Sequence, residues 1–354
     1  VQSVVEKYIT QFNEENSSGT TLGSKNTAVM VMNPQNGEIY ALVSLPEYDL
    51  NEPFVLTKAY EAEGKNQNDK LNDMWRNPVI SDSYEPGSTF KIITATAALE
   101  ERKVTLQDSF FCPGFKIVED RKIRCHKTQG HGSETFKQGV MNSCNPVFME
   151  IGARVGAKDM PRYYHKLGLY ERTGVDLPGE ANSIMHKLDK IGAVELATMS
   201  FGQSIQITPL QLMRAVSAGI NGGRLVTPHF ALEKKNPVTK EITEYEYKEK
   251  AGAVSKETSQ TLREVLEAVV AEGTGKNGQV EGYRVGGKTA TSEKLPRRSG
   301  KYISSFLGFA PADDPQVIVL LAYDNPKPVA AGANTTAGGW YISGGNMAAI
   351  MAGE

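Results

Sequence analysis

Residues 84–91 read Tyr-Glu-Pro-Gly-Ser-Thr-Phe-Lys, and this stretch is the strongest local signal in the chain. Its Pro-Gly pair ends the preceding segment, and the apolar run from Phe90 to Leu99 predicts a helix. Ser88 then lies in the first helical turn, where free N–H groups favour developing negative charge. Lys91 follows one turn later, within reach of the Ser88 hydroxyl. The two residues are therefore a candidate nucleophile and a candidate base.

A serine attacks a carbonyl only when a base accepts its proton, and lysine is a base only in its neutral form. Burial or a neighbouring positive charge must therefore lower the lysine pKa. The alternative is a serine that caps a helix, followed by a surface lysine. The spacing of Ser88 and Lys91 does not by itself distinguish the two interpretations, because Ser-x-x-Lys occurs by chance in most chains of this length.

Two later motifs favour the catalytic interpretation. Ser143-Cys144-Asn145 follows the first motif, and Lys288-Thr289-Ala290-Thr291 lies on a strand predicted over Tyr283–Thr291. The order Ser-x-x-Lys, Ser-x-Asn, Lys-Thr-small-Thr is the signature of penicillin-binding proteins and serine β-lactamases. The sequence resembles the transpeptidase domain of the class B penicillin-binding proteins from about Thr27 to the C-terminus. The further stretches that carry the resemblance are residues 82–88, 201–212 and 302–311.

The resemblance implies an α/β (α+β) fold of the penicillin-binding/β-lactamase-like type, with an antiparallel sheet flanked by helices and a mostly helical subdomain. The hydrophobic periodicity of the chain predicts compatible elements. Helices are expected at 1–15 and 256–272 and through 137–222, hairpins at 27–44 and 229–250, a loop at 61–73, an irregular insertion at 105–135, and strands at 283–291, 304–311 and 317–323. We expect two parts, namely an N-terminal helical stub of a truncated upstream region (1–26) and a catalytic domain (27–354).

Composition limits the function classes. The 354 residues carry 39 Lys and Arg against 41 Asp and Glu, a formal charge of −2, which excludes a broad electrostatic grip on nucleic acid or an anionic membrane. Forty percent hydrophobic and 23% charged residues are typical of a globular protein. The chain starts at Val1 rather than methionine, so we expect a piece of a longer protein. The resemblance implies an N-terminal membrane anchor outside this chain and a location at the extracytoplasmic face of the bacterial cell membrane.

Five residues receive catalytic roles from the resemblance. Ser88 would attack the carbonyl of the penultimate D-Ala in a peptidoglycan stem peptide ending D-Ala-D-Ala, which forms an acyl-enzyme. Lys91 would take the hydroxyl proton, and Ser143 would relay a proton to the leaving amine. Asn145 would hold Lys91 and the substrate amide, while Lys288 would supply positive charge near the substrate carboxylate. No cofactor is required for this acyl transfer.

The third motif supplies substrate-binding groups in the same scheme. Thr289 and Thr291 would offer hydroxyls to the substrate carboxylate, and the backbone N–H groups of Ser88 and Thr291 would form the oxyanion hole. Ala290 departs from the family pattern, which has glycine there so that a ligand backbone can lie close to the strand. Its methyl group either narrows the groove and changes β-lactam affinity, or points away from the groove and has no effect.

Cysteine and histidine gather between the first two motifs. Cys112, Cys125, Cys144, His126 and His131 all occur there, and four thiolate and imidazole ligands suit a tetrahedral structural zinc site. Some elongation-type members of the resembled family hold a metal in this region, and that likeness makes Cys112, Cys125, His131 and Cys144 the best four ligands, with His126 as the alternate. The competing interpretation is three small buried thiols, two of them in a disulfide.

The resemblance favours a DD-transpeptidase that β-lactam antibiotics acylate and that works with a glycosyltransferase partner in the membrane. Two alternatives stay open. One is a hydrolase of the same architecture, either a β-lactamase or a DD-carboxypeptidase. The other is a β-lactam sensor domain without a cross-linking activity of its own. Whether the cross-links would serve elongation, division or sporulation is not decided by the sequence.

Overall fold

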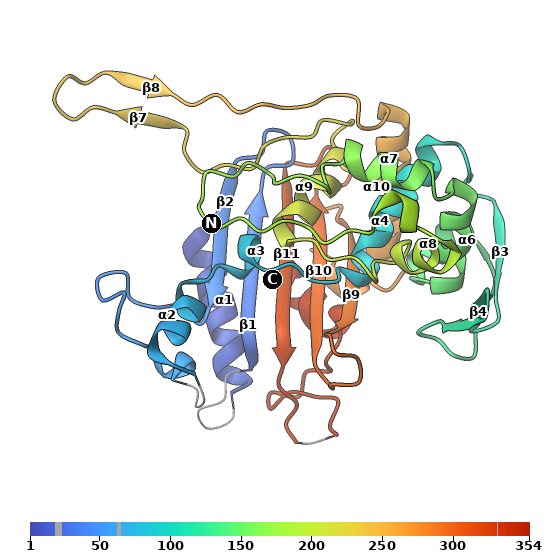
Figure 1. Ribbon diagram of the computed structural model, residues 1–354, viewed down its shortest axis with the longest axis horizontal. Coiled ribbons are helices and arrows are strands. Elements are labelled where there is room, and N and C mark those ends of the chain that lie inside the picture. Colours follow the sequence, from blue (N-terminus) through green and yellow to red (C-terminus); the bar gives the residue numbers. More distant parts are fainter. Residues whose placement is uncertain (18–22, 62–64, 331) are drawn as a thin grey trace.

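Five antiparallel strands form the central sheet of the computed structural model, which describes residues 1–17, 23–61, 65–330 and 332–354 (Figure 1). Their order across the sheet is β2-β1-β11-β10-β9, so strands from the two ends of the chain lie side by side. The strands are β1 Ser24–Met32, β2 Ile39–Leu45, β9 Gly286–Glu293, β10 Tyr302–Ala310 and β11 Val317–Pro326. The predicted hairpin and the three predicted C-terminal strands are confirmed, with shifted ends.

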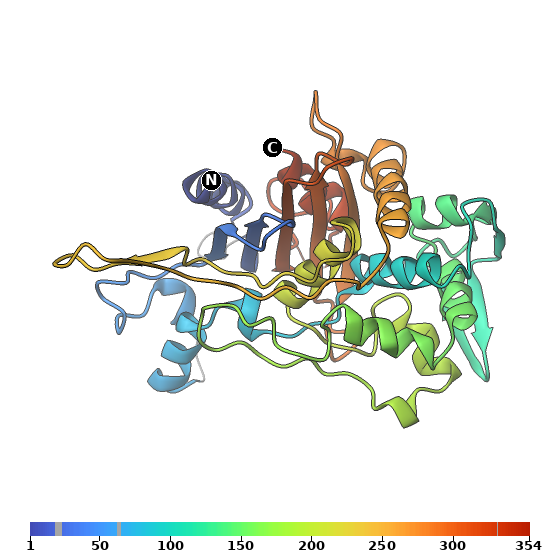
Figure 2. The same ribbon diagram turned by 90° about the horizontal axis from the view of Figure 1, so that it is seen from above.

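Both faces of the sheet are covered, and alternating side chains of the strands divide between two cores. Val29 and Val31 of β1 face a core that includes Phe12, whereas Met30 and Met32 belong to the larger core among the helices. Seen from above, α1 (Gln2–Glu15) and the C-terminal elements lie on one side of the sheet and the helical part lies on the other (Figure 2). The C-terminal elements are a π-helical turn, η5 (Gly344–Ala348), and α11 (Ala349–Gly353).

The helical part is built around α4 (Lys91–Glu100). Eight of its ten residues are buried, because this helix is apolar around most of its circumference and has neighbours on all sides. Three of these neighbours are α6 (Asn145–Val155), α9 (Pro209–Ile220) and α10 (Lys256–Ala271). The remaining helices are α2 Gln67–Trp75, α3 Pro78–Ser81, α5 Phe136–Met141, α7 Asp159–Lys166 and α8 Ala193–Met199. The expected antiparallel sheet with a mostly helical part is thus present.

Short strands occupy the segments predicted to be irregular or exposed. The insertion at 105–135 contains two small antiparallel ladders, and the segment at 229–250 is an extended hairpin that projects from the body of the molecule (Figure 1). The ladders pair β3 (Ser109–Cys112) with β6 (Gly132–Thr135), β4 (Phe115–Val118) with β5 (Arg121–Arg124), and β7 (Glu233–Lys235) with β8 (Ile242–Glu244).

The predicted loop at 61–73 is wrong from Gln67 onward, because α2 begins there; residues 62–64 lie outside the described part. Asn66 caps this helix by accepting a hydrogen bond from the Asp69 N–H. Only Leu71 and Met74 are buried, so the stretch lacks the apolar periodicity that would have revealed a helix. None of the helices in the described ranges combines the length and apolarity needed to cross a membrane.

Candidate active site

Ser88 lies in a short 3-10 turn, η2 (Gly87–Phe90), that leads directly into α4. Gly87 has φ of 57°, and a Cβ there would lie 2.2 Å from Ser292 Oγ, so the turn requires glycine. The Gly87 N–H donates to the Gly202 carbonyl at 2.9 Å, which fixes the turn against a neighbouring loop. Ser88 itself is partly exposed, as a nucleophile must be.

A cleft of about 450 Å³ opens in front of Ser88. All three motifs reach it, although they are far apart in the sequence. The predicted site residues that line the cleft are Ser88, Ser143, Asn145, Thr289, Ala290 and Thr291. The two predicted lysines are fully buried. The fold thus gathers the predicted catalytic and substrate-binding residues at one place.

Lys91 is held by the second motif. Its Nζ donates to the Ser143 carbonyl at 2.7 Å, to Ser143 Oγ at 3.1 Å and to Asn145 Oδ1 at 2.7 Å. Burial lowers the Lys91 pKa to about 8, while the nearby Cys125, Cys144 and Glu134 act in the opposite direction. Within the part of the chain that the structure describes, the hydrogen bonds of this amine go to Ser143 and Asn145 rather than to Ser88. The amine is therefore positioned by the second motif.

The second motif forms the entry to α6. Ser143 has φ of 53°, a left-handed conformation that is uncommon for a residue with a side chain. Cys144 is the N-cap of α6, and Asn145 is its first residue. The Asn145 amide donates to the Arg124 carbonyl of β5 at 3.3 Å and accepts from Lys91, so both ends of that side chain are fixed.

Lys288 lies on β9 and donates from Nζ to the Thr289 carbonyl at 3.2 Å. Burial lowers its pKa well below the usual value, and the positive charge of Lys91 lowers it further. Two buried ammonium groups in one site repel each other. Protonation of Lys91 therefore disfavours protonation of Lys288, and the reverse is also true.

The edge of the sheet forms one wall of the cleft. Strand β9 is the last strand in the order, so among the described residues no further strand pairs with its outer side. Ala290 is 3% exposed and lies with Ser292 on the face that meets the Gly87 turn. Thr291 is exposed, and its Oγ1 accepts from the Gly344 N–H at 2.9 Å, which leaves the hydroxyl proton available for a ligand.

Several residues that line the cleft were not predicted from the sequence. Thr274 and Asn277 follow α10, and Ser343 and Asn346 come from the C-terminal segment. The Asn277 amide donates to the Gly345 carbonyl at 2.9 Å, which joins the two segments. These small polar residues belong to no catalytic motif, and only the tertiary fold brings them to the cleft. Phe201 and Gln203 also line it; the stretch that contains them supported the resemblance, but the sequence assigned them no role.

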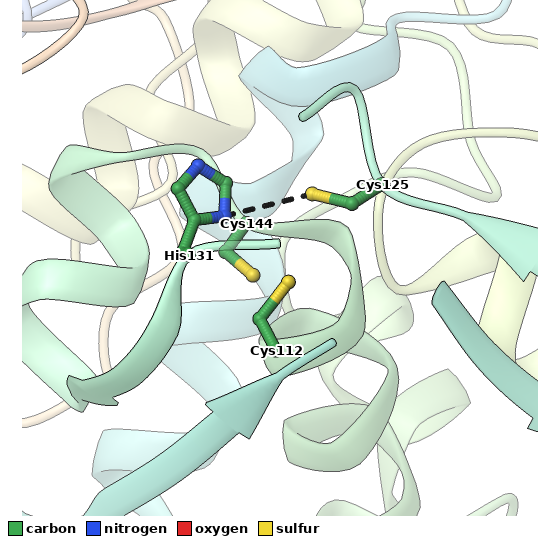
Figure 3. A group of neighbouring side chains, drawn as sticks. All are labelled: Cys112, Cys125, His131 and Cys144. Atoms are coloured by element: carbon green, nitrogen blue, oxygen red, sulfur yellow. Dashed lines mark hydrogen bonds between the residues drawn. The ribbon is translucent and has the colours of Figure 1, made fainter. Parts of the chain in front are cut away.

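The four predicted metal ligands come together beside the second motif. One potential ligand atom from each of Cys112, Cys125, His131 and Cys144 lies within 4.8 Å of the others (Figure 3). Cys125 Sγ is 3.7 Å from His131 Nδ1, and all three cysteines are buried free thiols rather than partners in a disulfide. The alternate ligand, His126, bonds instead through Nε2 to the Asn142 carbonyl at 2.9 Å and lines the cleft.

The surroundings of this cluster favour thiolate at Cys125, whereas the hydrogen bond to Cys125 and burial raise the pKa of Cys144. A hydrogen bond from the Cys144 thiol lowers the Cys125 pKa, and burial opposes this effect. Glu134 is buried beside the cluster and accepts from the Asn142 amide at 2.7 Å through one carboxylate oxygen. Its other oxygen lies 3.8 Å from His131 Nδ1 and has no hydrogen-bond partner among the described residues. Thiol, imidazole and carboxylate groups are thus concentrated in one buried place.

Comparison with protein families and solved structures agrees with this geometry. The family model described as "Penicillin binding protein transpeptidase domain" matches residues 27–341. Penicillin-binding protein 3 of Mycobacterium tuberculosis, solved in complex with ampicillin, has a TM-score of 0.84 at 25% identity and covers 99% of this chain and 75% of that chain. The apo transpeptidase domain of Burkholderia pseudomallei penicillin-binding protein 3 has a TM-score of 0.76 at 26% identity, covering 99% and 91%.

Two curated relatives are similar over most of this chain. Stage V sporulation protein D of Bacillus subtilis (strain 168) is 45% identical over 305 residues, 84% of this chain but only 45% of that protein. The probable peptidoglycan D,D-transpeptidase PenA of Neisseria flavescens is 31% identical over 354 residues, 97% of this chain and 78% of that protein. The expected penicillin-binding fold is confirmed. The chain therefore belongs to the penicillin-binding protein transpeptidase family.

Proposed function

We propose that this chain is a serine DD-transpeptidase that cross-links peptidoglycan stem peptides. The observation that carries the proposal is the position of Lys91, a buried amine held by Ser143 and Asn145 one helical turn from the accessible Ser88. The names of the relatives support it, since PenA of Neisseria is described as a probable peptidoglycan D,D-transpeptidase.

The first half of the reaction acylates Ser88. Its Oγ attacks the penultimate D-Ala carbonyl while neutral Lys91 accepts the hydroxyl proton. With a pKa of about 8, roughly a tenth of the Lys91 amines are neutral at pH 7. The C–N bond then breaks, the terminal D-Ala leaves, and the proton reaches its amine through Ser143, which lies 3.1 Å from Lys91. In the second half, an acceptor amine attacks the ester and regenerates Ser88.

The third motif binds the substrate in this proposal. The terminal carboxylate lies against Thr289 and Thr291, where its negative charge would favour the protonated form of the nearby Lys288, and the peptide backbone runs along the edge of β9. The N–H groups of Ser88 and Thr291 stabilise the oxyanion, a contribution of about 3 kcal/mol per donor in comparable enzymes. A β-lactam ring presents a similar carbonyl and carboxylate, so we expect β-lactams to acylate Ser88.

Intact mass after incubation with a β-lactam tests the acylation. We expect stoichiometric addition to the native chain and none to Ser88→Ala. Ser88→Ala modified to the same extent would refute the assignment of the nucleophile. The lifetime of the adduct separates the alternatives, because a hydrolase regenerates free enzyme within seconds to minutes. Cross-linking of lipid-linked substrate separates a transpeptidase from a sensor domain, which would form a stable adduct but no cross-link.

We further propose that Cys112, Cys125, His131 and Cys144 bind one structural zinc ion. The residues fit this ion: four soft or borderline ligands lie within 4.8 Å of one another, and tetrahedral zinc with bonds of about 2.3 Å to sulfur separates its ligands by roughly 4 Å. A four-ligand site is closed to substrate, so the ion would supply rigidity and not chemistry. It would brace Cys144, which lies between Ser143 and Asn145.

The chain spans less than half of the Bacillus relative, so activity in the whole protein is also a proposal. We propose that the whole protein is anchored at the extracytoplasmic face of the cell membrane, works with a glycosyltransferase, and carries residues 1–26 as the end of an upstream region. The name of the relative, a stage V sporulation protein, supports a role in sporulation rather than in elongation or division.

A further inference from the structure

Strand β5 and the residues after it carry a dense cluster of positive charge. Residues 121–127 read Arg-Lys-Ile-Arg-Cys-His-Lys, in a chain whose net charge is only −2. Arg121, Lys122 and Arg124 are exposed, and across the described residues no ion pair joins any of them to a carboxylate. A nearby acid of α6, Glu150, is already paired with Lys116 and Arg154. Lys122 Nζ lies 3.8 Å from the centroid of the Phe115 ring, a contact that leaves its charge unneutralised, so all three cations can attract an anionic ligand.

These cations line a groove that opens into the active site. The groove has a volume of about 390 Å³, and Arg121, Lys122 and Arg124 form one side of it. Three residues line both the groove and the catalytic cleft: Asn145, Phe201 and Gln203. The Asn145 amide also donates to the Arg124 carbonyl, so the cationic strand is attached directly to a catalytic-site residue.

The position of the groove indicates which part of a substrate would enter it. In the proposed function, the terminal carboxylate of the donor peptide lies at Thr289 and Thr291, and neither residue lines the groove. The groove instead meets the cleft at Asn145, Phe201 and Gln203, away from the two threonines. With the terminal carboxylate at the threonines, the part of the donor that can reach the groove is a side chain upstream of the D-Ala pair. The acidic residues of the β4–β5 turn, Glu119 and Asp120, do not line the groove, although their charges reduce the positive potential there.

We propose that Arg121, Lys122 and Arg124 form a subsite for a carboxylate-bearing residue upstream of D-Ala-D-Ala in the donor peptide. The proposal rests on the proposed function and adds a substrate preference to it. Because the three side chains are exposed, each ion pair contributes modestly and is weakened by salt. Three cations acting on one carboxylate should still give a preference of about tenfold in kcat/KM for an acidic over an amidated donor at low ionic strength.

The test compares matched donor peptides. The peptides have the form N-acetyl-X-D-Ala-D-Ala, where X is glutamate or 2-aminopimelate. Each acidic peptide is compared with the peptide that carries the corresponding side-chain amide. Acylation of Ser88 is measured by intact mass and by the release of D-Ala. The variant is Arg121→Gln/Lys122→Gln/Arg124→Gln. The control, Lys234→Gln/Lys235→Gln/Lys240→Gln, removes the same charge from the projecting hairpin, and Tm verifies that both variants fold. A small β-lactam without a second carboxylate reports the intact nucleophile.

We expect the native chain and the control to prefer at least one acidic donor, and the triple β5 variant to lose that preference while keeping its β-lactam acylation. Equal rates with acid and amide in the native chain, or a preference that survives the β5 substitutions, would overturn the subsite. Binding to vesicles with and without anionic lipid supplies a further test. If the three cations bind only membranes, the β5 substitutions would change vesicle binding and leave the donor preference unchanged. Absence of acylation by every peptide and β-lactam would instead count against the proposed function.

Discussion

At the level of single residues, the two buried lysines dominate the chemistry of the site. Lys91 and Lys288 are both completely buried, and each loses the solvation that normally stabilises an ammonium group. Lys91 recovers part of that stabilisation from its oxygen acceptors on Ser143 and Asn145. Burial lowers its pKa to about 8, and nearby cysteine and glutamate groups limit that shift, which leaves the pKa close to the range where a general base is most effective.

This position of the Lys91 pKa predicts a pH dependence. In the proposed mechanism only the neutral Lys91 amine accepts the Ser88 proton, so acylation should rise with pH up to a plateau, with a midpoint near 8. At pH 6 the rate should be lower than the plateau by roughly a hundredfold. Stopped-flow acylation by a β-lactam between pH 6 and 10 measures this limb, and Lys91→Met should remove most of the activity at every pH. A flat profile would exclude Lys91 as the titrating base.

Ala290 gives a second prediction at this scale. A Cβ placed on Gly87 would lie 3.8 Å from the Ala290 methyl, so this methyl group packs against the Ser88 turn, and the residue is only 3% exposed although it lines the cleft. We therefore expect Ala290→Gly to change β-lactam acylation by less than about threefold. The added glycine should lower the free energy of unfolding by roughly 1 kcal/mol. Acylation rates with several β-lactams and thermal unfolding measure both effects, and a tenfold gain in acylation would show that the methyl narrows the groove.

At the level of elements, the sequence predicted those segments whose pattern reflects their burial. The strands β9–β11 and the helix α10 were found because apolar residues repeat at the strand or helix period. The helix α2 was missed because only two of its residues face the core. The same limit applies to the site: Ser88, Asn145 and Lys288 belong to recognisable motifs, whereas Asn277 and Asn346 reach the cleft only through the packing of distant segments.

The insertion at 105–135 carries the element-scale prediction, since the proposed metal connects it to the start of α6. Cys112→Ser should abolish zinc binding, lower Tm by on the order of 5 °C, and slow acylation through the loss of support at Cys144. Metal content by mass spectrometry, thermal unfolding and β-lactam acylation report the three effects. Lys127→Gln is the matched control, because this exposed residue lies in the same segment between Cys125 and His131 and does not line the cleft. Purified native protein without stoichiometric metal would refute the site.

At the scale of the whole molecule, the proposed catalysis depends on the interface between the sheet and the helical part. Ser88 and Lys91 come from the helical side, whereas Lys288 and Thr291 come from the edge strand of the sheet. The order of the motifs identified these residues, but not how the sheet is assembled. Its central strand, β11, pairs with β1 on one side and β10 on the other, so the N-terminal strands complete a sheet whose edge at the cleft comes from the C-terminal third of the chain.

Substitutions in the first helix, α1, test whether an element on the opposite face of the sheet contributes to the stability of the whole molecule. Phe12 of α1 is completely buried, with its ring centroid 4.3 Å from that of Tyr323 on β11 and 5.6 Å from that of Trp340. Phe12→Ala should therefore lower the free energy of unfolding by about 3–5 kcal/mol. Val4→Ala on the same helix, at a side chain that is 55% exposed, should change it by less than about 0.5 kcal/mol. Denaturant unfolding measures both variants.

Acylation at low temperature should be retained in Phe12→Ala, because Phe12 does not line the cleft and the folded fraction keeps its motifs. If Phe12→Ala has the same free energy of unfolding as Val4→Ala, the 1–26 segment is a dispensable extension of the catalytic unit. A large loss of stability would show that α1 is an integral part of the fold that covers one face of the sheet.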